Sequence, residues 1–278
     1  MSAAGITVNA ATACFPGLSV HDAIAAIQAG ASEPLIGTLS SEHVQLCPQS
    51  GGHLDERTCE DLRHAHPQTR FRLHANARVL SRHVRYDASN FNADTRFYYE
   101  ALADRSRRLG ATAYSIHAGY RRNCDLPTML DNMRRIQDIF GDIQVAVEGL
   151  YPHERLPQLM DGWDEYLTVL KSGIPLAIDL SHLKIVERAQ ASVDTQLLIE
   201  LLRSPTTLEV HLSDNDGSSD RHDVLAKEPF WWAYRHHVCP SAVIFSEGNQ
   251  IRARGLQRRR CGPLTTSTTT KESHHDHH

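Results

Sequence analysis

Residues 143–149 (IQVAVEG) and 175–182 (PLAIDLSH) carry the strongest fold signal in the chain. Each is a short apolar run that leads into a carboxylate, and an amphipathic helical pattern separates the two. The same alternation continues in both directions along the sequence. Strands that alternate with helices are typical of parallel βαβ units, which close into a barrel or form an open, doubly wound sheet.

Working outward, eight runs bounded by Gly, Pro, Asn or Asp predict strands at residues 5–13, 34–38, 71–76, 111–118, 143–149, 175–182, 208–214 and 242–248. Apolar residues three and four apart predict helices at 20–29, 56–65, 95–109, 129–140, 163–171 and 195–202. Residues 221–240 are expected to form a long loop with a short helix. We therefore predict a single-domain (β/α)8 TIM barrel over residues 1–261 and a disordered Ser/Thr/His-rich tail over 262–278.

The composition of the chain excludes several classes of protein. Hydrophobic residues make up 41% of the 278 residues and charged residues 22%, which excludes a disordered chain and a fibrous repeat. The sequence has no apolar run of about 18 residues and no secretory leader pattern, so we expect a soluble, cytoplasmic protein with no membrane partner. Six scattered cysteines without a CxxC pair fit a reducing compartment. No GxGxxG follows the first strand, and no P-loop motif occurs.

Histidines and carboxylates fall at the carboxyl ends of the predicted strands or in the loops that follow them. In a parallel barrel these ends converge on one mouth, so residues far apart in sequence are expected to share one pocket. The chain has 18 histidines, of which the terminal SHHDHH is set aside. The expected pocket contains His74, His117, Glu148, Asp179, His182, His211, Asp220, His222 and Glu247.

This residue set points to metal chemistry. Four carboxylates in one pocket would repel each other without cations, and imidazole with carboxylate is a ligand set for Zn, Mn or Fe(II). Nine ligands exceed the needs of one ion, so two or three divalent ions are expected. Taken singly, each residue also has an ordinary structural explanation, such as a strand-end histidine, a local Asp–His hydrogen bond or turn chemistry.

At this point the chain resembles a known superfamily, the xylose isomerase-like TIM barrels, and within it endonuclease IV. The resemblance is carried by IDxxH (Ile178, Asp179, His182), HLxD (His211, Leu212, Asp214) and DRH (Asp220, Arg221, His222). It implies that all nine pocket residues are counterparts of a trinuclear metal site. Two stretches depart from the family pattern: DVLAKEPFWW follows His222 in place of a Gly-rich segment, and EGLYPHE begins at Glu148. The loops that would grip a DNA duplex are not recognisable.

Four functions follow from this pattern. The first is hydrolysis of a phosphoester by a bridging hydroxide, in which Arg221 clamps a phosphate oxygen and Tyr120 and Arg121 shape the entrance. The second is sugar isomerisation or epimerisation, in which Glu148 and Glu247 move a proton beside a carbonyl group. The others are a multinuclear non-heme iron oxidase and a metal-storage module. A small anionic substrate is expected, because four carboxylates, three divalent ions and one bridging hydroxide would leave a charge of about +1 at the site. The net charge of −4 gives no indication of nucleic-acid binding, so nucleic acid is not favoured.

Overall fold

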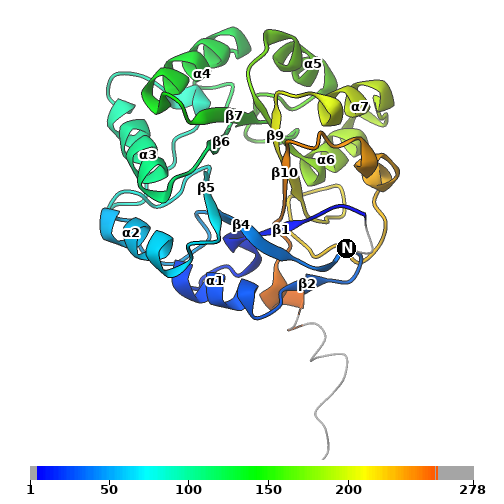
Figure 1. The fold of residues 1–278 in the computed structure, drawn as a ribbon. Helices are drawn as coiled ribbons and strands as arrows, with labels where there is room; N and C mark the ends of the chain where they lie inside the picture. Colours follow the sequence, from blue (N-terminus) through cyan, green and yellow to red (C-terminus); the bar gives the residue numbers. More distant parts are fainter. Residues whose placement is uncertain (1–4, 254, 256–278) are drawn as a thin grey trace, which may run out of the picture.

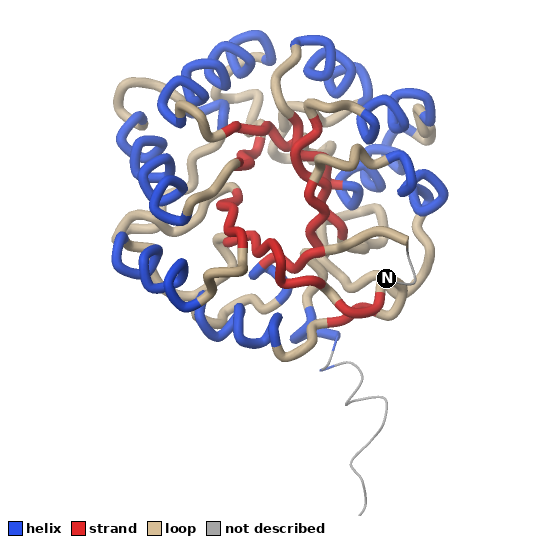
Figure 2. Tube along the Cα trace, in the orientation of Figure 1, coloured by secondary structure: helices blue, strands red, loops and turns tan. Residues whose placement is uncertain are grey.

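The computed structural model describes residues 5–253 and 255, and it contains a closed barrel of eight strands. Each neighbouring pair is parallel, in the order β1-β10-β9-β8-β7-β6-β5-β4. The predicted (β/α)8 barrel is therefore confirmed, and Figure 2 shows the ring of strands with helices outside it. The barrel strands are β1 Asn9–Ala11, β4 Ser40–Leu46, β5 Arg70–His74, β6 Ala113–His117, β7 Gln144–Glu148, β8 Leu176–Asp179, β9 Thr207–Leu212 and β10 Val243–Ser246. The predicted tail, 262–278, lies outside the described residues.

Seven complete α-helices, α1 to α7, surround the barrel (Figure 1), and six of them are where the apolar periodicity predicts them; residues 250–253 are also helical. Asp55, Asp125 and Asp194 cap the amino ends of three helices through their side chains, as helix N-termini require. The helices are α1 Val20–Gln28, α2 Glu56–Ala65, α3 Arg96–Leu109, α4 Leu126–Phe140, α5 Trp163–Ser172, α6 Leu180–Gln190 and α7 Thr195–Arg203. Short 3-10 helices occupy Thr12–Cys14 (η1), Ala88–Asn90 (η2) and Phe230–His237 (η3), the last within the predicted long loop.

The second barrel strand differs from the prediction. Residues 34–38 do not enter the barrel: Ser32–Glu33 (β2) and Gly37–Thr38 (β3) form a separate antiparallel pair. The strand that pairs with β1 and β5 is β4, whose sequence SSEHVQL looks too polar for a buried strand. Its polar character has a physical reason, because Gln45 points into the barrel and hydrogen-bonds Glu209 there.

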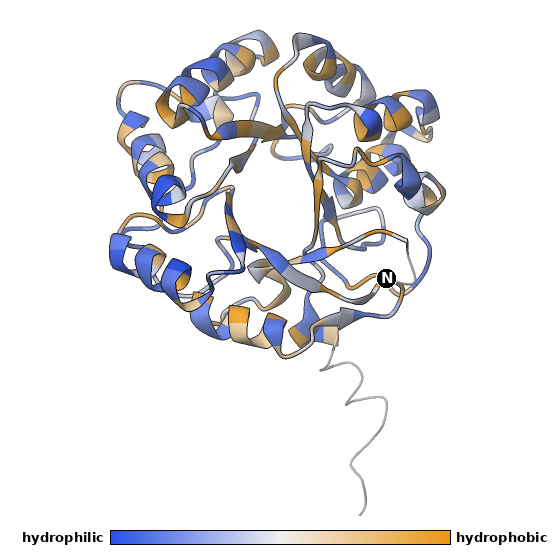
Figure 3. Ribbon diagram, viewed as in Figure 1, coloured by the Kyte–Doolittle hydropathy of each residue, from blue (hydrophilic) through white to orange (hydrophobic). Residues whose placement is uncertain are grey.

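The apolar core lies between the strands and the helices. Figure 3 shows the hydrophobic residues of the helices on the sides that face the barrel. Tyr114 of β6, for example, stacks on Phe140 of α4 with ring centroids 4.9 Å apart. No helix among the described residues has both the length and the apolar character needed to cross a bilayer.

Candidate metal centre

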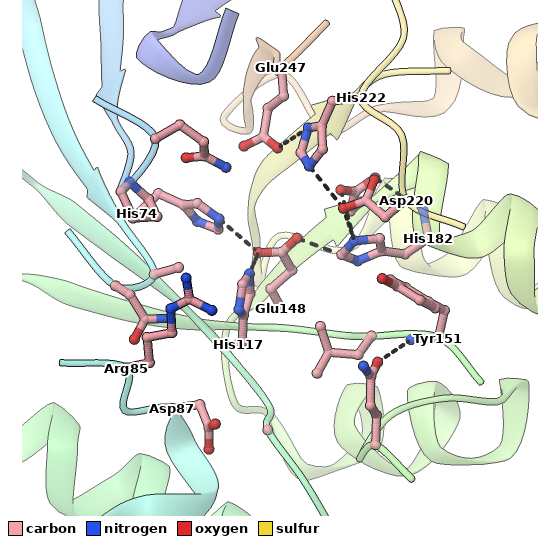
Figure 4. Close-up of a pocket in the computed structure, with 18 of the residues that line it drawn as sticks. His74, Arg85, Asp87, His117, Glu148, Tyr151, His182, Asp220, His222 and Glu247 are labelled. Carbon is pink, nitrogen blue, oxygen red and sulfur yellow. Dashed lines mark hydrogen bonds and ion pairs between the residues drawn. The ribbon is translucent and has the colours of Figure 1, made fainter. Parts of the chain in front are cut away.

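The strand-end histidines and carboxylates lie at one mouth of the barrel, as expected for residues at the carboxyl ends of parallel strands. His74, His117, Glu148 and Asp179 are the last residues of four successive strands, β5 to β8. Eight of the nine predicted residues line one cavity of about 440 Å³. The ninth, His211, is fully buried behind it and contacts Glu148. Figure 4 labels seven of the nine side chains, which point toward one another across the cavity: His74, His117, Glu148, His182, Asp220, His222 and Glu247.

Glu148 is the centre of the cluster. Its Oε2 lies 3.3 Å from His74 Nε2 and 3.5 Å from His117 Nε2, and its Oε1 lies 3.4 Å from His211 Nδ1 and 3.6 Å from His182 Nδ1. The side chain is 1% exposed. One carboxylate that faces four imidazoles has the arrangement expected of a ligand shared between cations.

A second group of ligand-type residues lies on the side of the cavity formed by the loop after β9. His222 Nε2 is 2.8 Å from Asp220 Oδ2, and its Nδ1 is 3.4 Å from Glu247 Oε2. His182 Nε2 lies 3.5 Å from both Asp179 and Asp220, so it joins the two groups. His222 has a φ of 49°, in the left-handed region that non-glycine residues rarely adopt. Such strain is found at functional sites, where the surrounding structure holds it in place.

The residues present fit divalent cations. Three sets of ligand atoms lie within 4.8 Å of one another: His74–Glu148–His211, Glu148–Asp179–His182 and Asp179–His211–Glu247. Every member is buried, and Glu148, Asp179 and His211 each belong to two sets. Within the described chain, several buried atoms here lack a hydrogen-bond partner: Glu148 Oε2, His211 Nδ1, Asp220 Oδ1, His222 Nδ1 and Glu247 Oε1. Orphaned lone pairs of this kind are costly unless a proton or a cation satisfies them.

The pKa values of the cluster also indicate that it can hold cations. Burial raises the pKa of Glu247 to about 7, even though His211 and His222 favour its charged form. Burial also lowers the pKa of His74 to about 3. Burial alone would lower the pKa of His222, but Asp220 raises it to about 9. Without metal, protons on residues such as His222 and Glu247 therefore occupy positions where several ligand atoms lie close together.

Of three comparisons with known proteins, the one with solved structures finds similar folds. No protein-family model and no curated protein matches the chain. Among solved structures, a D-tagatose 3-epimerase-like protein aligns with a TM-score of 0.65 at 12% identity, over 92% of this chain and 97% of that chain. A xylose isomerase domain containing protein from Salmonella typhimurium LT2 aligns at 0.59 and 13%, over 87% and 90%. AP endonuclease family 2 from Brucella melitensis aligns at 0.56 and 14%, over 88% and 93%.

The chain shares its TIM barrel fold with these solved structures, which include a xylose isomerase domain containing protein. The resemblance drawn from the sequence motifs is thus confirmed at the level of the fold. Because this fold is shared by epimerase-like proteins and an AP endonuclease, the reaction must be argued from the side chains at the mouth of the barrel.

The three predicted substrate contacts lie in different environments. Tyr120 lines the cavity. Arg121 instead forms ion pairs with Asp161 at 2.7 Å and with Glu165 at 2.8 Å, and it does not line the cavity.

Arg221, next to two ligand residues in sequence, turns outward and is 48% exposed. It pairs with Asp223 at 2.9 Å and with Asp216 at 3.5 Å. The structure therefore does not bring Arg121 or Arg221 to the site, because neighbouring carboxylates hold both guanidinium groups elsewhere.

Basic residues that the sequence analysis overlooked replace them. Arg78, His83 and Arg85, all in the loop after β5, line the cavity together with the ligand-type residues. Figure 4 shows Arg85 on the wall near His117. Their signal in the sequence is a basic segment, 78–85 (RVLSRHVR), that begins four residues after a strand-end histidine.

Tyr151, in the loop after β7, was also overlooked. Its ring packs on His182 with centroids 4.8 Å apart and forms part of the cavity wall. An aromatic wall beside polar groups is common in small-molecule sites, where it orients the ligand and excludes water.

Proposed function

We propose that the chain is a metal-dependent hydrolase that cleaves a phosphoester in a small anionic substrate. The observation that carries the proposal is the cluster of nine ligand-type side chains at one mouth of the barrel, eight of them lining one cavity, with Glu148 facing four histidines. A tetrahedral or octahedral ion uses four to six ligands, so this set suits two or three divalent ions of Zn, Mn or Fe. Multinuclear sites of this kind are typical of enzymes that act on phosphate esters.

The bound ions would supply Lewis acidity at the phosphoryl oxygens and would lower the pKa of an attacking water. The protein's share of the work follows from the geometry. Glu148 and Asp179 belong to two ligand sets each, so they are the residues that would hold more than one ion. Glu247, which shares a ligand set with Asp179 and His211, would hold an ion on the side of the cavity where His222 lies.

The cavity indicates the kind of substrate. Its volume of about 440 Å³ lies in the range of small-molecule pockets. Arg78 and Arg85 place positive charge on one wall, and within the described residues neither guanidinium has a carboxylate within 4 Å. Guanidinium groups bind phosphate and carboxylate through paired N–H donors. These two arginines therefore take over the anion-binding role that the sequence assigned to Arg221.

A second candidate is epimerisation of a sugar. The observation that favours it is the set Asp179–His211–Glu247, which could hold one ion beside Glu148. Glu148 and Glu247 would then exchange a proton with the carbon next to a carbonyl group. This chemistry does not need His74, His117 or His222. Several similar solved structures are named as sugar epimerases or as epimerase-like, which supports this candidate.

The two candidates are separated by the histidines that only one of them needs. Protein loaded with Zn, Mn or Fe(II) would be assayed against phosphomonoesters, phosphodiesters and ketoses, alongside H117A and H222A. A matched control is H64A, since His64 is an exposed histidine on α2. For a hydrolase, H117A and H222A should each lower kcat/KM more than about 100-fold, beyond the usual cost of losing an outer-shell partner.

Sugar turnover that survives in both variants would favour the epimerase. Dioxygen consumption by anaerobically iron-loaded protein, without ester cleavage, would instead favour an oxidase. Wild-type protein that takes up no metal would refute the proposal.

A further inference from the structure

Beneath the metal centre, the interior of the barrel is polar. Arg72 of β5, Ser115 of β6 and Glu209 of β9 are buried there, and they contact one another together with Gln45. No residue of this group was predicted to act in the site. An ion pair inside a barrel is costly to bury, and replacing it by packed apolar residues is often neutral or stabilising. Its presence directly under the ligand histidines suggests a role in the site.

We propose that Glu209 is a positioning residue that fixes the ring tautomers of His211 and His74, leaving the nitrogen that faces Glu148 free to bind metal in each ring. This inference rests on the metal centre of the proposed function. It adds to the site a residue, Glu209, that does not line the cavity and does not lie at the carboxyl end of its strand.

The Glu209 carboxylate is the meeting point of the network. Its Oε2 lies 3.1 Å from His211 Nε2 and accepts hydrogen bonds from Ser115 Oγ at 2.7 Å and Gln45 Nε2 at 2.8 Å. Its Oε1 accepts from Arg72 Nη1 at 3.0 Å. Three side chains donate to this carboxylate, one of them the charged guanidinium of Arg72, so the ionised group is an acceptor only.

For His211 the consequence is direct. An ionised carboxylate can only accept, so His211 Nε2 must carry the hydrogen that it donates to Glu209. In the neutral ring, Nδ1 is then the unprotonated nitrogen. That atom lies 3.4 Å from Glu148 Oε1 and 3.9 Å from Glu247 Oε1, and it has no hydrogen-bond partner in the described chain. Gln45 Nε2 lies 2.9 Å from the same His211 Nε2 and could donate to it only if that nitrogen were unprotonated. The Nε2 lone pair would then face the Glu209 carboxylate at 3.1 Å, so the charge-assisted hydrogen bond to Glu209 decides the tautomer.

For His74 the effect passes through Ser115. The serine hydroxyl donates its one hydrogen to Glu209, so it can only accept from His74 Nδ1, which lies 2.9 Å from Ser115 Oγ. His74 therefore carries its hydrogen on Nδ1. Its Nε2 is left unprotonated and lies 3.3 Å from Glu148 Oε2. One buried carboxylate thus sets both rings in the state in which they can ligate an ion.

A Glu209→Met substitution tests this directly, because it removes the acceptor and keeps a side chain of similar length. Gln45 Nε2 would remain 2.9 Å from His211 Nε2 and, as a donor, would make that nitrogen accept. The ring hydrogen would move to Nδ1, the ligand atom. Losing an outer-shell partner of a metal-ligating histidine typically costs about 10–100-fold in metal affinity.

The variants must separate positioning from folding, because E209M leaves Arg72 charged and buried. R72M/E209M removes that charge as well, so it tests the same tautomers without the unpaired cation. The matched control is E33M, since Glu33 is also a buried carboxylate but hydrogen-bonds Leu225 and Ser246 and, within the described chain, makes no hydrogen bond or ion pair to any of the nine. Zinc and Mn(II) affinities would be measured by competition with a chelator, and the ring tautomers by 15N NMR of the histidines.

We expect E209M and R72M/E209M to lose about 10–100-fold in metal affinity, while E33M stays within about twofold of wild type. In zinc-loaded wild type, His211 should show a protonated Nε2, and this signal should be lost in both variants that carry E209M. Unchanged affinity and tautomers in R72M/E209M would overturn the inference, even if its thermal midpoint fell. Wild type that binds no zinc would refute the proposed function instead, and the His74 Nδ1–H signal, present in wild type and lost in R72M/E209M, would still test Glu209.

Discussion

The glycine that follows Glu148 offers the sharpest test of how the barrel supports its site. A Cβ added at Gly149 would overlap Cζ, Oη and Cε1 of Tyr166, all closer than the 3.0 Å below which real Cβ contacts essentially never fall. Tyr166 is fully buried on α5, so its ring has no room to swing away. Overpacking of a tight core costs about 1–3 kcal/mol, and three simultaneous overlaps place G149A at the upper end, about 3 kcal/mol.

The same substitution should reach the metal centre. The carbonyl oxygen of Gly149 lies 2.9 Å from His182 Nδ1, and this hydrogen bond leaves His182 Nε2 facing Asp179 and Asp220. A backbone shift that relieves the overlap with Tyr166 moves this acceptor. We therefore expect G149A to lose metal affinity by about tenfold or more, as for other outer-shell partners.

A double-mutant cycle isolates the overlap. Y166L removes the ring atoms in question and should itself cost about 2 kcal/mol through the cavity it leaves. In the Y166L background, adding G149A should cost less than about 1 kcal/mol, which corresponds to a coupling of about 2 kcal/mol. The free energies would be measured by urea denaturation of metal-free protein. Costs that add within about 0.5 kcal/mol would show that Tyr166 does not constrain Gly149, and the reasoning would fail.

Three further predictions concern the site itself. Asp220 raises the pKa of His222 to about 9 in spite of burial, so below that pH a metal ion must displace a proton from this ring. Metal affinity, measured by competition with a chelator, should therefore rise about tenfold per pH unit for each displaced proton and level off above about pH 9. Chelation should lower the thermal midpoint, since ions at about 1,000 times their Kd stabilise the folded state by about 4 kcal/mol; an unchanged midpoint would argue against a folded-state metal site. R78M and R85M should raise KM for anionic substrates in steady-state assays about tenfold, whereas R121M, already paired with Asp161 and Glu165, should not.

Much of the site could be predicted because, in a parallel barrel, the place of a residue along its strand determines at which end of the barrel it lies. His74, His117, Glu148 and Asp179 end successive strands, and parallel strands must end at the same mouth. The apolar run of β7 packs against helix α4, and its boundaries were clear in the sequence. In such segments local pattern and tertiary position agree.

The misses have a common physical cause, which is that side-chain direction in loops depends on tertiary partners. Arg221 lies between two ligand residues in sequence, yet Asp216 and Asp223 turn it outward. Helix α6 was missed because it begins directly after β8, where Asp179 ends the strand and also caps the helix through Ser181 N. No separate polar segment marks that boundary in the sequence.

The strand that the sequence misplaced and the residue that it overlooked belong to one arrangement. Strand β4 escaped the apolar-run criterion because Gln45 is polar, and Gln45 is polar because its amide donates to Glu209. Glu209 is in turn held by Arg72 and sits under His211. Hydrophobic patterning fails where the barrel gives up apolar packing to build a support for its ligand histidines. A barrel with an apolar interior could hold the same nine residues at its mouth, but it would not fix the tautomers of His74 and His211.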